Sequence, residues 1–200
     1  MATANDIVNF ALTKLGQETV SDYTADNNAR ARVMNSLYDI QRKALLRQYR
    51  WAFSKKRASL ASLTTTPEFG YAYEYQLPTD CLQLILVNGD QPDPNWTRYN
   101  ENPIPEYVVE GRKILSGDEG PIEIIYVSDA EEAGDFDAAF VEAFATKLAR
   151  EGCMKITQSR TQKQALDEDY ATSIQLAIRA NAIERPSEMQ ADTTWVLDRL

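Results

Sequence analysis

The sequence contains no histidine, and this absence excludes more chemistry than any other feature of its composition. Histidine is the usual general base near neutral pH and the commonest zinc ligand. Catalysis by a Ser–His–Asp triad or a Cys–His pair is therefore excluded. The chain also lacks the spacing of a calcium loop, and no glycine-rich segment has the Gly-Lys-Ser/Thr ending of a phosphate loop. We therefore expect no metal and no cofactor.

Cysteine and long apolar runs are scarce as well. Cys81 and Cys153 are the only cysteines, and both stand in apolar surroundings without a paired spacing, which predicts buried free thiols in a reducing cytoplasm. No apolar run approaches the roughly 20 residues that cross a bilayer. The N-terminus lacks the basic start of a signal peptide and carries Asp6 within its apolar pattern. We expect a protein made in the cytoplasm, without a membrane partner.

Basic residues are outnumbered by acidic ones. With 21 Lys and Arg against 30 Asp and Glu, the formal net charge is −9 and the pI is about 4.6. This balance argues against tight binding to nucleic acid, which requires a basic surface to neutralise phosphates. The hydrophobic fraction of 44% is that of an ordinary soluble globular protein, and 200 residues suffice for one core.

Helical periodicity dominates the two ends of the chain. We predict a first helix over 3–15, which Thr3 and Asp6 begin with a capping box. A long second helix follows, capped by Asp26 or Asn27, and we expect it to be the spine of a bundle. Its predicted apolar stripe comprises Ala29, Val33, Leu37, Ile40, Ala44, Leu45 and Tyr49.

Two further helices are predicted after residue 134. The third begins at Asp135 or Asp137 and continues to about Ile156, with an apolar stripe of Phe136, Phe140, Phe144, Leu148 and Ala149. The fourth spans about 159–183 and ends before Pro186. Its inward residues are predicted to be Ala165, Tyr170, Ile174, Ala177 and Ile178.

Between these helical ends, the period changes to that of β-strands. Trp51 and Phe53 alternate with smaller residues, which predicts that a strand begins at Trp51. Asn88-Gly89 and Glu110-Gly111 predict turns. One strand face is predicted to carry Leu82, Leu84 and Leu86, and another Ile122, Ile124 and Tyr126.

The resulting fold class is α+β, a bundle of about four helices with an antiparallel β unit inserted between the second and third helices. We predict a single domain over 1–200, with helices in 3–50 and 135–185, the β insertion in 51–128 and an extended C-terminal arm in 186–200.

A run of basic residues surrounds the end of the long helix: Arg42, Lys43, Arg47, Arg50, Lys55, Lys56 and Arg57. Tyr49, Trp51 and Phe53 are interleaved with it. Such a run suits contact with nucleic acid or with an acidic partner surface, including a neighbouring copy of the chain in a ring. It equally suits a solvated helix face whose aromatic neighbours point inward.

Carboxylates crowd the stretch before the third helix: Asp129, Glu131, Glu132, Asp135 and Asp137. Pairs of carboxylates can hydrolyse glycosides without histidine. Acidic residues are also favoured before a helix by its dipole, with no chemistry involved.

Two further segments have exposed character with large apolar groups. The arm after Pro186 is polar until Trp195, Val196, Leu197 and Leu200, which suit docking on another chain or folding back on the bundle. The polar, proline-rich loop after Gly89 carries Trp96 and Tyr99.

Several motifs occur in an order that resembles the head-to-tail adaptor family of short-tailed bacteriophages, also called tail tubular protein A. They lie within residues 1–185 and read LTKLGQETVSDY, LLRQYRWAFSKKRASL, YEYQLPTDCLQL, VVEGRKIL, IEIIYVSD and FDAAFVEAFATKLA. The arm after Pro186 lies outside the resemblance.

The resemblance implies a non-enzymatic virion protein of the neck. Such adaptors form a ring, expected to be a dodecamer, that binds the portal protein above and the tail nozzle protein below and extends the channel for DNA ejection. It makes the arm with Trp195, Val196, Leu197 and Leu200 the candidate portal contact and the loop with Trp96 and Tyr99 the candidate nozzle contact. Arg47, Arg50, Lys55, Lys56 and Arg57 are candidates for subunit or portal contact.

Double-stranded DNA is expected to pass through the channel without specific binding, because an acidic surface repels phosphates. Two alternatives remain open at this point. One is a carbohydrate-hydrolysing tail component that uses the carboxylates, and the other is a soluble helical interaction module unrelated to virions.

Overall fold

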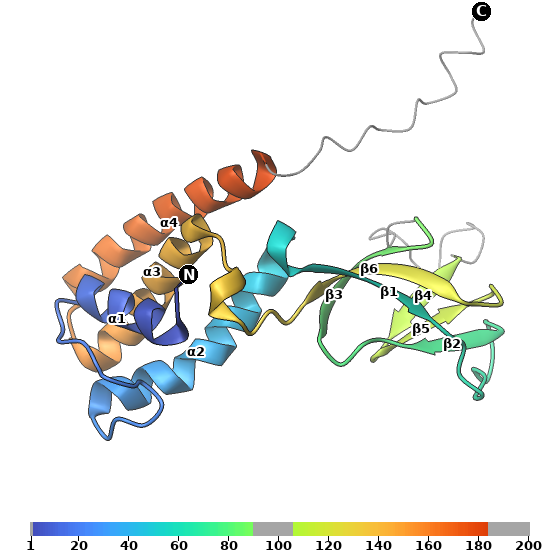
Figure 1. The fold of residues 1–200 in the computed structure, drawn as a ribbon, viewed down its shortest axis with the longest axis horizontal. Helices are drawn as coiled ribbons and strands as arrows, with labels where there is room; N and C mark the ends of the chain where they lie inside the picture. The colour runs from blue at the N-terminus through green and yellow to red at the C-terminus, as the bar shows by residue number, and fades with distance from the viewer. Residues whose placement is uncertain (1, 90–105, 184–200) are drawn as a thin grey trace, which may run out of the picture.

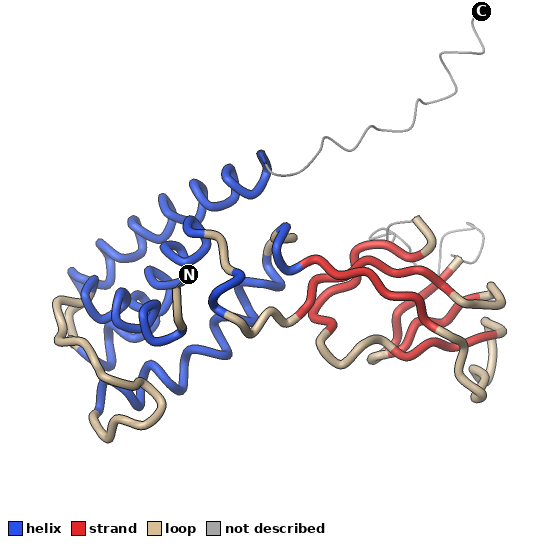
Figure 2. Tube along the Cα trace, in the orientation of Figure 1, coloured by secondary structure: helices blue, strands red, loops and turns tan. Residues whose placement is uncertain are grey.

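The structure is a computed structural model that describes residues 2–89 and 106–183. Within these residues, helices and strands separate into two parts, which lie at opposite ends of the longest axis (Figures 1 and 2). The predicted α+β class is confirmed, because the strands all lie between the second and third helices.

Four α-helices and two short 3₁₀ helices form the helical part of the described chain. They are α1 (Ala4–Lys14), α2 (Ala29–Gln48), η1 (Ala52–Ser54), η2 (Ala133–Asp135), α3 (Ala138–Ile156) and α4 (Arg160–Ile183). The predicted capping box starts α1, since the Thr3 side chain accepts a hydrogen bond from the Asp6 amide and the Asp6 side chain accepts one from Thr3. Asp137 caps α3, one of the two predicted starts.

Two three-stranded antiparallel sheets form the β part. Their strands are β1 (Lys55–Leu60), β2 (Tyr73–Gln76), β3 (Cys81–Val87), β4 (Tyr107–Glu110), β5 (Lys113–Ser116) and β6 (Ile122–Ser128). The order is β1-β6-β3 in one sheet and β2-β5-β4 in the other. The predicted turn at Glu110-Gly111 joins β4 to β5, with Gly111 at a φ of 61° that favours glycine.

The spine of the bundle is α3, which corrects the expectation that α2 is the spine. Helix α3 packs against α1, α2 and α4 alike. The reason lies in its composition, because every residue from 143 to 149 is buried and small residues let neighbours approach from all sides. The predicted α3 stripe is confirmed, with Phe140, Phe144 and Leu148 fully buried.

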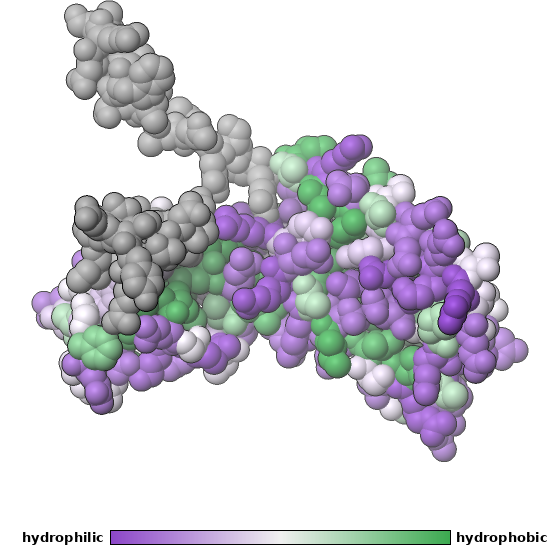
Figure 3. Space-filling model, turned by 180° about the vertical axis from the view of Figure 1, so that it is seen from behind, coloured by the Kyte–Doolittle hydropathy of each residue, from purple (hydrophilic) through white to green (hydrophobic). Residues whose placement is uncertain are grey.

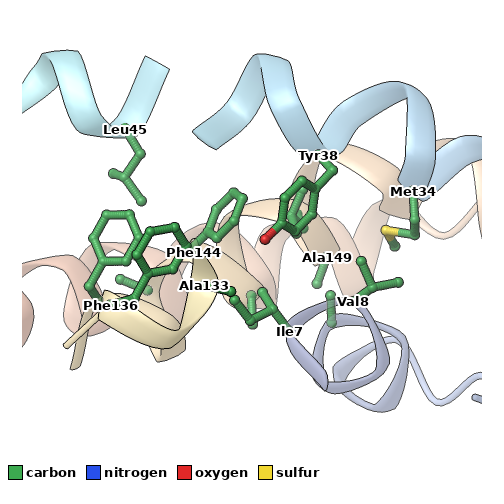
Figure 4. Packing of buried hydrophobic residues seen from close by; sticks show 14 of the residues in the cluster. Ile7, Val8, Met34, Tyr38, Leu45, Ala133, Phe136, Phe144 and Ala149 are labelled. Carbon is green, nitrogen blue, oxygen red and sulfur yellow. The ribbon is translucent and has the colours of Figure 1, made fainter. Parts of the chain in front are cut away.

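The buried face of α2 differs from the predicted stripe. Its inward residues are Ala31, Met34, Tyr38, Arg42, Leu45 and Leu46. Of the predicted stripe, Leu45 is buried, but Ile40 is 64% exposed and Ala29 and Ala44 are also exposed. Figure 4 shows Met34 and Tyr38 pointing from α2 toward the other helices. Tyr38 fills the space between Tyr23 and Phe144, with ring centroids 5.2 Å from each, so the larger side chains decide which face turns inward.

The observed N-cap of α2 and one inward residue of α4 each lie one or two positions from the predicted ones. The N-cap of α2 is Asn28, whose side chain accepts from the Ala31 amide, and not Asp26 or Asn27. In α4, Ile174 and Ala177 are buried as predicted, but Ala165 is exposed and Leu166 is buried in its place.

The predicted strand start at Trp51 is wrong. Residues 52–54 form η1, and the strand β1 begins at Lys55. Trp51 is held by the helix before it, since its Nε1 donates to the Leu45 carbonyl at 3.0 Å. This bond holds the indole of Trp51 against the last turn of α2.

Of the two predicted strand faces, the one on β6 is confirmed and the one on β3 is wrong. Ile122, Ile124 and Tyr126 share the β core, as predicted. Leu82, Leu84 and Leu86 do not share a face, because β3 changes register twice against β6. Each such shift reverses the side on which later residues point. Leu84 therefore lies in the β core, while Leu82 and Leu86 pack against the helical core.

Candidate interaction site at the helical–β junction

The buried arginine Arg42 joins the helical part to the β part. Arg42 is 2% exposed, and its Nη1 donates to Asp129 Oδ1 at 2.5 Å and to the Ala130 carbonyl at 2.6 Å. Asp129 directly follows β6, and its side chain is only 10% exposed. A buried charge is tolerated only when it is paired and hydrogen-bonded, so this contact fixes the end of β6 to α2.

Two lysines complete the ionic contacts of the junction. Lys43 Nζ lies 3.0 Å from Asp129 Oδ2, so Asp129 serves two cations. Lys56 on β1 lies 2.8 Å from Asp80 Oδ2, and the Tyr126 hydroxyl donates to Asp80 Oδ1 at 3.1 Å. The basic run and the acidic stretch, which the sequence presents as separate features, therefore meet in one place.

The environment of Asp80 favours its charged form. Burial by itself would raise the pKa of Asp80, but the hydrogen bonds from Lys56 and Tyr126 outweigh it and hold the pKa below its usual value. Burial and the bond to the Asp80 carboxylate raise the pKa of Tyr126 to about 12. Both shifts stabilise a neutral tyrosine bound to an ionised aspartate.

An open cavity of about 610 Å³ lies at this junction. Its charged lining residues are Lys43, Lys56, Asp80, Asp129, Glu131, Glu132 and Asp135. The five carboxylates outnumber the two lysines, so the cavity is formally negative. Glu131, Glu132 and Asp135 are exposed, and their side chains have no hydrogen-bond or ion-pair partner within the described chain. The cavity can therefore receive a cationic group from another molecule.

The carboxylates of the acidic stretch have different roles. Asp137 caps α3 by accepting from the amides of Ala139 and Phe140. Asp129 is the partner of Arg42. A glycosidase requires a carboxylic acid with a raised pKa as its general acid. The pKa of Asp80, a carboxylate of the cavity, is lowered instead.

The aromatic residues of the basic run point inward. Trp51 is 1% exposed, and its ring lies 4.9 Å from that of Phe140. Phe53 packs against Phe136 and Phe140. Trp51 is therefore not available to stack on nucleic-acid bases, whereas Tyr49 and Phe53 are half-buried and Phe53 also lines the cavity.

The remaining cations of the basic run lie beyond the cavity. Arg47 donates to the Leu82 carbonyl and so ties α2 to β3. Arg57 is exposed on β1, beside a second cavity of about 470 Å³ that also includes Glu123. Arg50 is half-buried, and its carbonyl accepts from Asn181 Nδ2 at 3.3 Å.

Asn181 of α4 holds the segment that follows α2, and no sequence pattern predicts this role. Its Oδ1 also accepts from the Ala52 amide at 2.7 Å, so one amide side chain holds the end of α4 to both sides of Trp51. Nothing in its local sequence marks it, because its partners lie far away along the chain.

Other predicted features have mixed outcomes. Cys81 and Cys153 are free and buried, as predicted. Trp96 and Tyr99, like Trp195, Val196, Leu197 and Leu200, lie outside the described residues. In the described part of the chain, no helix combines the length and apolarity needed to cross a membrane, and no three His, Cys, Asp or Glu side chains are grouped as metal ligands.

On the face seen in Figure 3, hydrophilic side chains separate patches of hydrophobic ones on both parts of the molecule.

Comparisons with known proteins add no assignment to this geometry. The sequence matches no protein-family model and no curated protein.

Proposed function

We propose that this chain is a structural connector in the neck of a short-tailed bacteriophage virion. It assembles as a ring beneath the portal vertex, expected to be a dodecamer, joins the portal protein to the tail nozzle protein and lengthens the channel through which DNA is ejected. It acts without catalysis or a cofactor. The proposal is supported by the order of the sequence motifs and by the insertion of the β unit between α2 and α3.

The observation that carries the proposal is the buried contact at the junction between the helical part and the β part. The β part has a hydrophobic core of its own, the core of the helical part extends onto Ile85 of β3 and Val127 of β6, and the buried Arg42–Asp129 contact ties α2 to the end of β6. A connector needs two distinct binding ends at a fixed spacing. The formal charge of −9 suits a channel wall along which DNA slides without adhering.

The first test is the mass of the full chain by light scattering, alone and then with the portal protein encoded in the same genome. We expect a ring-sized complex when the portal is present. A ring in both samples would keep the connector role and show that the portal is not needed as a template. A monomer in both samples, with a portal that is competent in capsid assembly, would contradict the proposal.

The candidate contacts can be tested one at a time with variants that leave the ionic contacts of the junction unchanged. Reversing the charges of Arg50 and Arg57 leaves Arg42, Lys43 and Asp129 intact. If this variant assembles as the natural chain does, these cations are not part of a contact. Ending the chain at Pro186 tests the arm in the same way, and unchanged portal binding would remove the arm from the portal contact.

The carboxylates of the cavity allow a test of one enzymatic alternative. A tail component that hydrolyses carbohydrate would use acids of this cavity. Hydrolysis that disappears when Glu131, Glu132 and Asp135 are changed to amides would favour this alternative, since these side chains have no structural partner in the described chain. A gene neighbourhood without portal, capsid and nozzle genes would instead favour an interaction module unrelated to virions.

A further inference from the structure

Phe69 is an exposed aromatic side chain in the connection between β1 and β2. It is 76% exposed and has no ring or cation contact within the described chain. Phe10 on α1, by comparison, is 39% exposed and lies 5.0 Å from Lys14 Nζ, measured to its ring centroid. Burying a side chain of this kind contributes about 1.5–3 kcal/mol, so the ring of Phe69 can add substantially to a protein contact.

The connection that carries Phe69 is held at its base by Glu74 of β2. The Leu63 amide donates to the Glu74 carbonyl at 2.8 Å. The side chain of Glu74 accepts from Lys113 Nζ on β5 at 2.7 Å. Gly70, next to Phe69, has a φ of 88°, which glycine adopts without strain. The ring is therefore presented on a preformed loop, which lowers the entropic cost of binding.

Strand directions place this connection at the end of the β part that lies away from the helices. Leu60 pairs with Ile122, so β1 ends where β6 begins. Tyr73 and Tyr107 both pair with Ser116, so β2 and β4 begin where β5 ends. Figure 1 shows the ends of β1 and β5 turned away from the helical part. The distal end, as we call it, consists of the connections 61–72, 88–106 and 117–121.

The distal end is strongly acidic. Its described charged side chains are all acidic and exposed, namely Glu68, Glu106, Asp118 and Glu119. By sequence, residues 90–105 add three acids and one arginine, Arg98. On the adjoining strands, Arg57 and Glu123 line one cavity together with Asn88, and their formal charges cancel. An exposed phenylalanine thus lies on an end with a clear excess of negative charge.

We propose that the distal end binds a partner protein whose surface has an apolar pocket within a basic rim, and that Phe69 enters this pocket. A central aromatic anchor with a polar rim is the usual anatomy of a protein interface. The negative charge disfavours DNA, an anionic membrane and the distal end of a second copy as partners, because each of these is negative as well. The inference rests on the proposed connector function, in which this partner is the tail nozzle protein.

The first test is the affinity of the nozzle protein encoded in the same genome for the full chain assembled on its portal. Biolayer interferometry measures both rate constants. Phe69→Ala should weaken binding at least about tenfold, mainly through faster dissociation, because it removes the anchor. Phe10→Ala truncates the same type of side chain on α1 and is the matched control, which should leave the affinity unchanged.

A double variant, Glu68→Lys with Glu119→Lys, tests the charge of the rim. Both side chains are exposed and have no hydrogen-bond or ion-pair partner in the described chain. The variant should slow association at least about threefold at low salt, and the difference should shrink as salt screens the charges. The control is Glu168→Lys with Asp169→Lys on α4, which changes the net charge equally. Equal slowing by both double variants would overturn the basic rim.

Photo-cross-linking identifies what covers the ring. A benzophenone amino acid is introduced in place of Phe69, and the ring on the portal is irradiated with and without the nozzle protein. We expect an adduct with a nozzle peptide that contains lysine or arginine. An adduct with another copy of the chain, or within the same chain, that forms equally well without the nozzle protein would overturn the inference.

The outcomes separate this inference from the proposed function. If the chain forms a ring on the portal and Phe69→Ala still binds the nozzle protein normally, the inference is overturned and the connector role remains. If the chain binds the nozzle protein through Phe69 but never joins the portal, the inference is supported and the connector role is contradicted. If the natural chain binds neither protein, both are overturned. Circular dichroism should show the same helix content in every variant, because the altered side chains are exposed.

Discussion

At the residue scale, the stability of the joint depends on one buried charge. Arg42 is almost fully buried, while its partners range from the nearly buried Asp129 to Asp39, whose side chain is 74% exposed. Coulomb attraction is strong only where water is excluded, so these two carboxylates contribute very differently although both contact the same guanidinium.

Changing Asp129→Asn should therefore destabilise the protein strongly. Removing the charged partner of a buried ion costs about 3–5 kcal/mol, because the guanidinium stays buried without its nearly buried counter-charge. Asp39→Asn is the matched control, since it removes an exposed carboxylate from the same arginine and should cost less than about 1 kcal/mol. Urea unfolding of the two variants measures both values. Equal effects would show that Asp129 does not carry the joint.

Asp80 makes the stability of the protein depend on pH. Its pKa in the folded protein lies below the usual 3.8, so its contribution to stability is present above that pH and is lost as the pH falls through the lower, folded-state pKa. The urea midpoint of the natural chain should exceed that of Asp80→Asn near pH 6, and the difference should shrink below pH 3.8.

The control for this comparison is Glu131→Gln, which alters an exposed carboxylate of the same cavity that has no ion-pair partner among the described residues. Near pH 6, the urea midpoint of Glu131→Gln should differ less from that of the natural chain than the midpoint of Asp80→Asn does. If the difference in urea midpoint between the natural chain and Asp80→Asn stayed constant down to the lowest pH, the hydrogen bonds and ion pair around Asp80 would not contribute as described.

At the element scale, α3 is held in place by a cluster of aromatic side chains. Phe140 is fully buried, and its ring lies 4.9 Å from both Trp51 and Phe53, which come from the segment that leaves α2. The same ring contacts Phe136 before α3 and Phe144 within it. This one side chain thus links the central helix to the start of the β part.

Phe140→Ala should lower the free energy of unfolding by about 3–5 kcal/mol, because it removes a large buried ring and leaves a cavity among rings that cannot all collapse into it. Ile183→Ala, a truncation of an 85% exposed side chain, should change stability little. Thermal and urea unfolding of the isolated chain measure the difference. A small effect at Phe140 would mean that the cluster is loosely packed.

At the scale of the whole molecule, an excess of nine negative charges governs long-range interactions. Arg42 and Lys43 are paired with Asp129, and Lys56 is paired with Asp80, so these three cations of the basic run are neutralised at the junction. A chain of this net charge repels the phosphate backbone.

The full chain should therefore leave the mobility of a short DNA duplex unchanged in a gel at moderate salt. A variant with Glu131, Glu132 and Asp135 all changed to lysine provides the positive comparison, because it reverses the charge of the cavity. Binding by the natural chain that weakens steeply with salt would contradict a channel wall along which DNA slides.

Local signals in the sequence determined the elements of this fold. The capping residues Thr3 and Asp137, the turn at Glu110-Gly111 and the aromatic spacing of α3 act on neighbours within a few residues, so the sequence alone predicts them. The alternation from Ile122 to Tyr126 predicted its buried face in the same way.

The tertiary structure alone decided which of two possible faces of α2 is buried, and where the charges meet. The stripes around Ile40 and around Met34 both have helical spacing, and only the packing of Tyr38 beside Phe144 selects the second. Arg42 and Asp129 are 87 residues apart in the chain. Periodicity records that a face is apolar, but not which partner covers it, because the partner is supplied by residues distant in sequence.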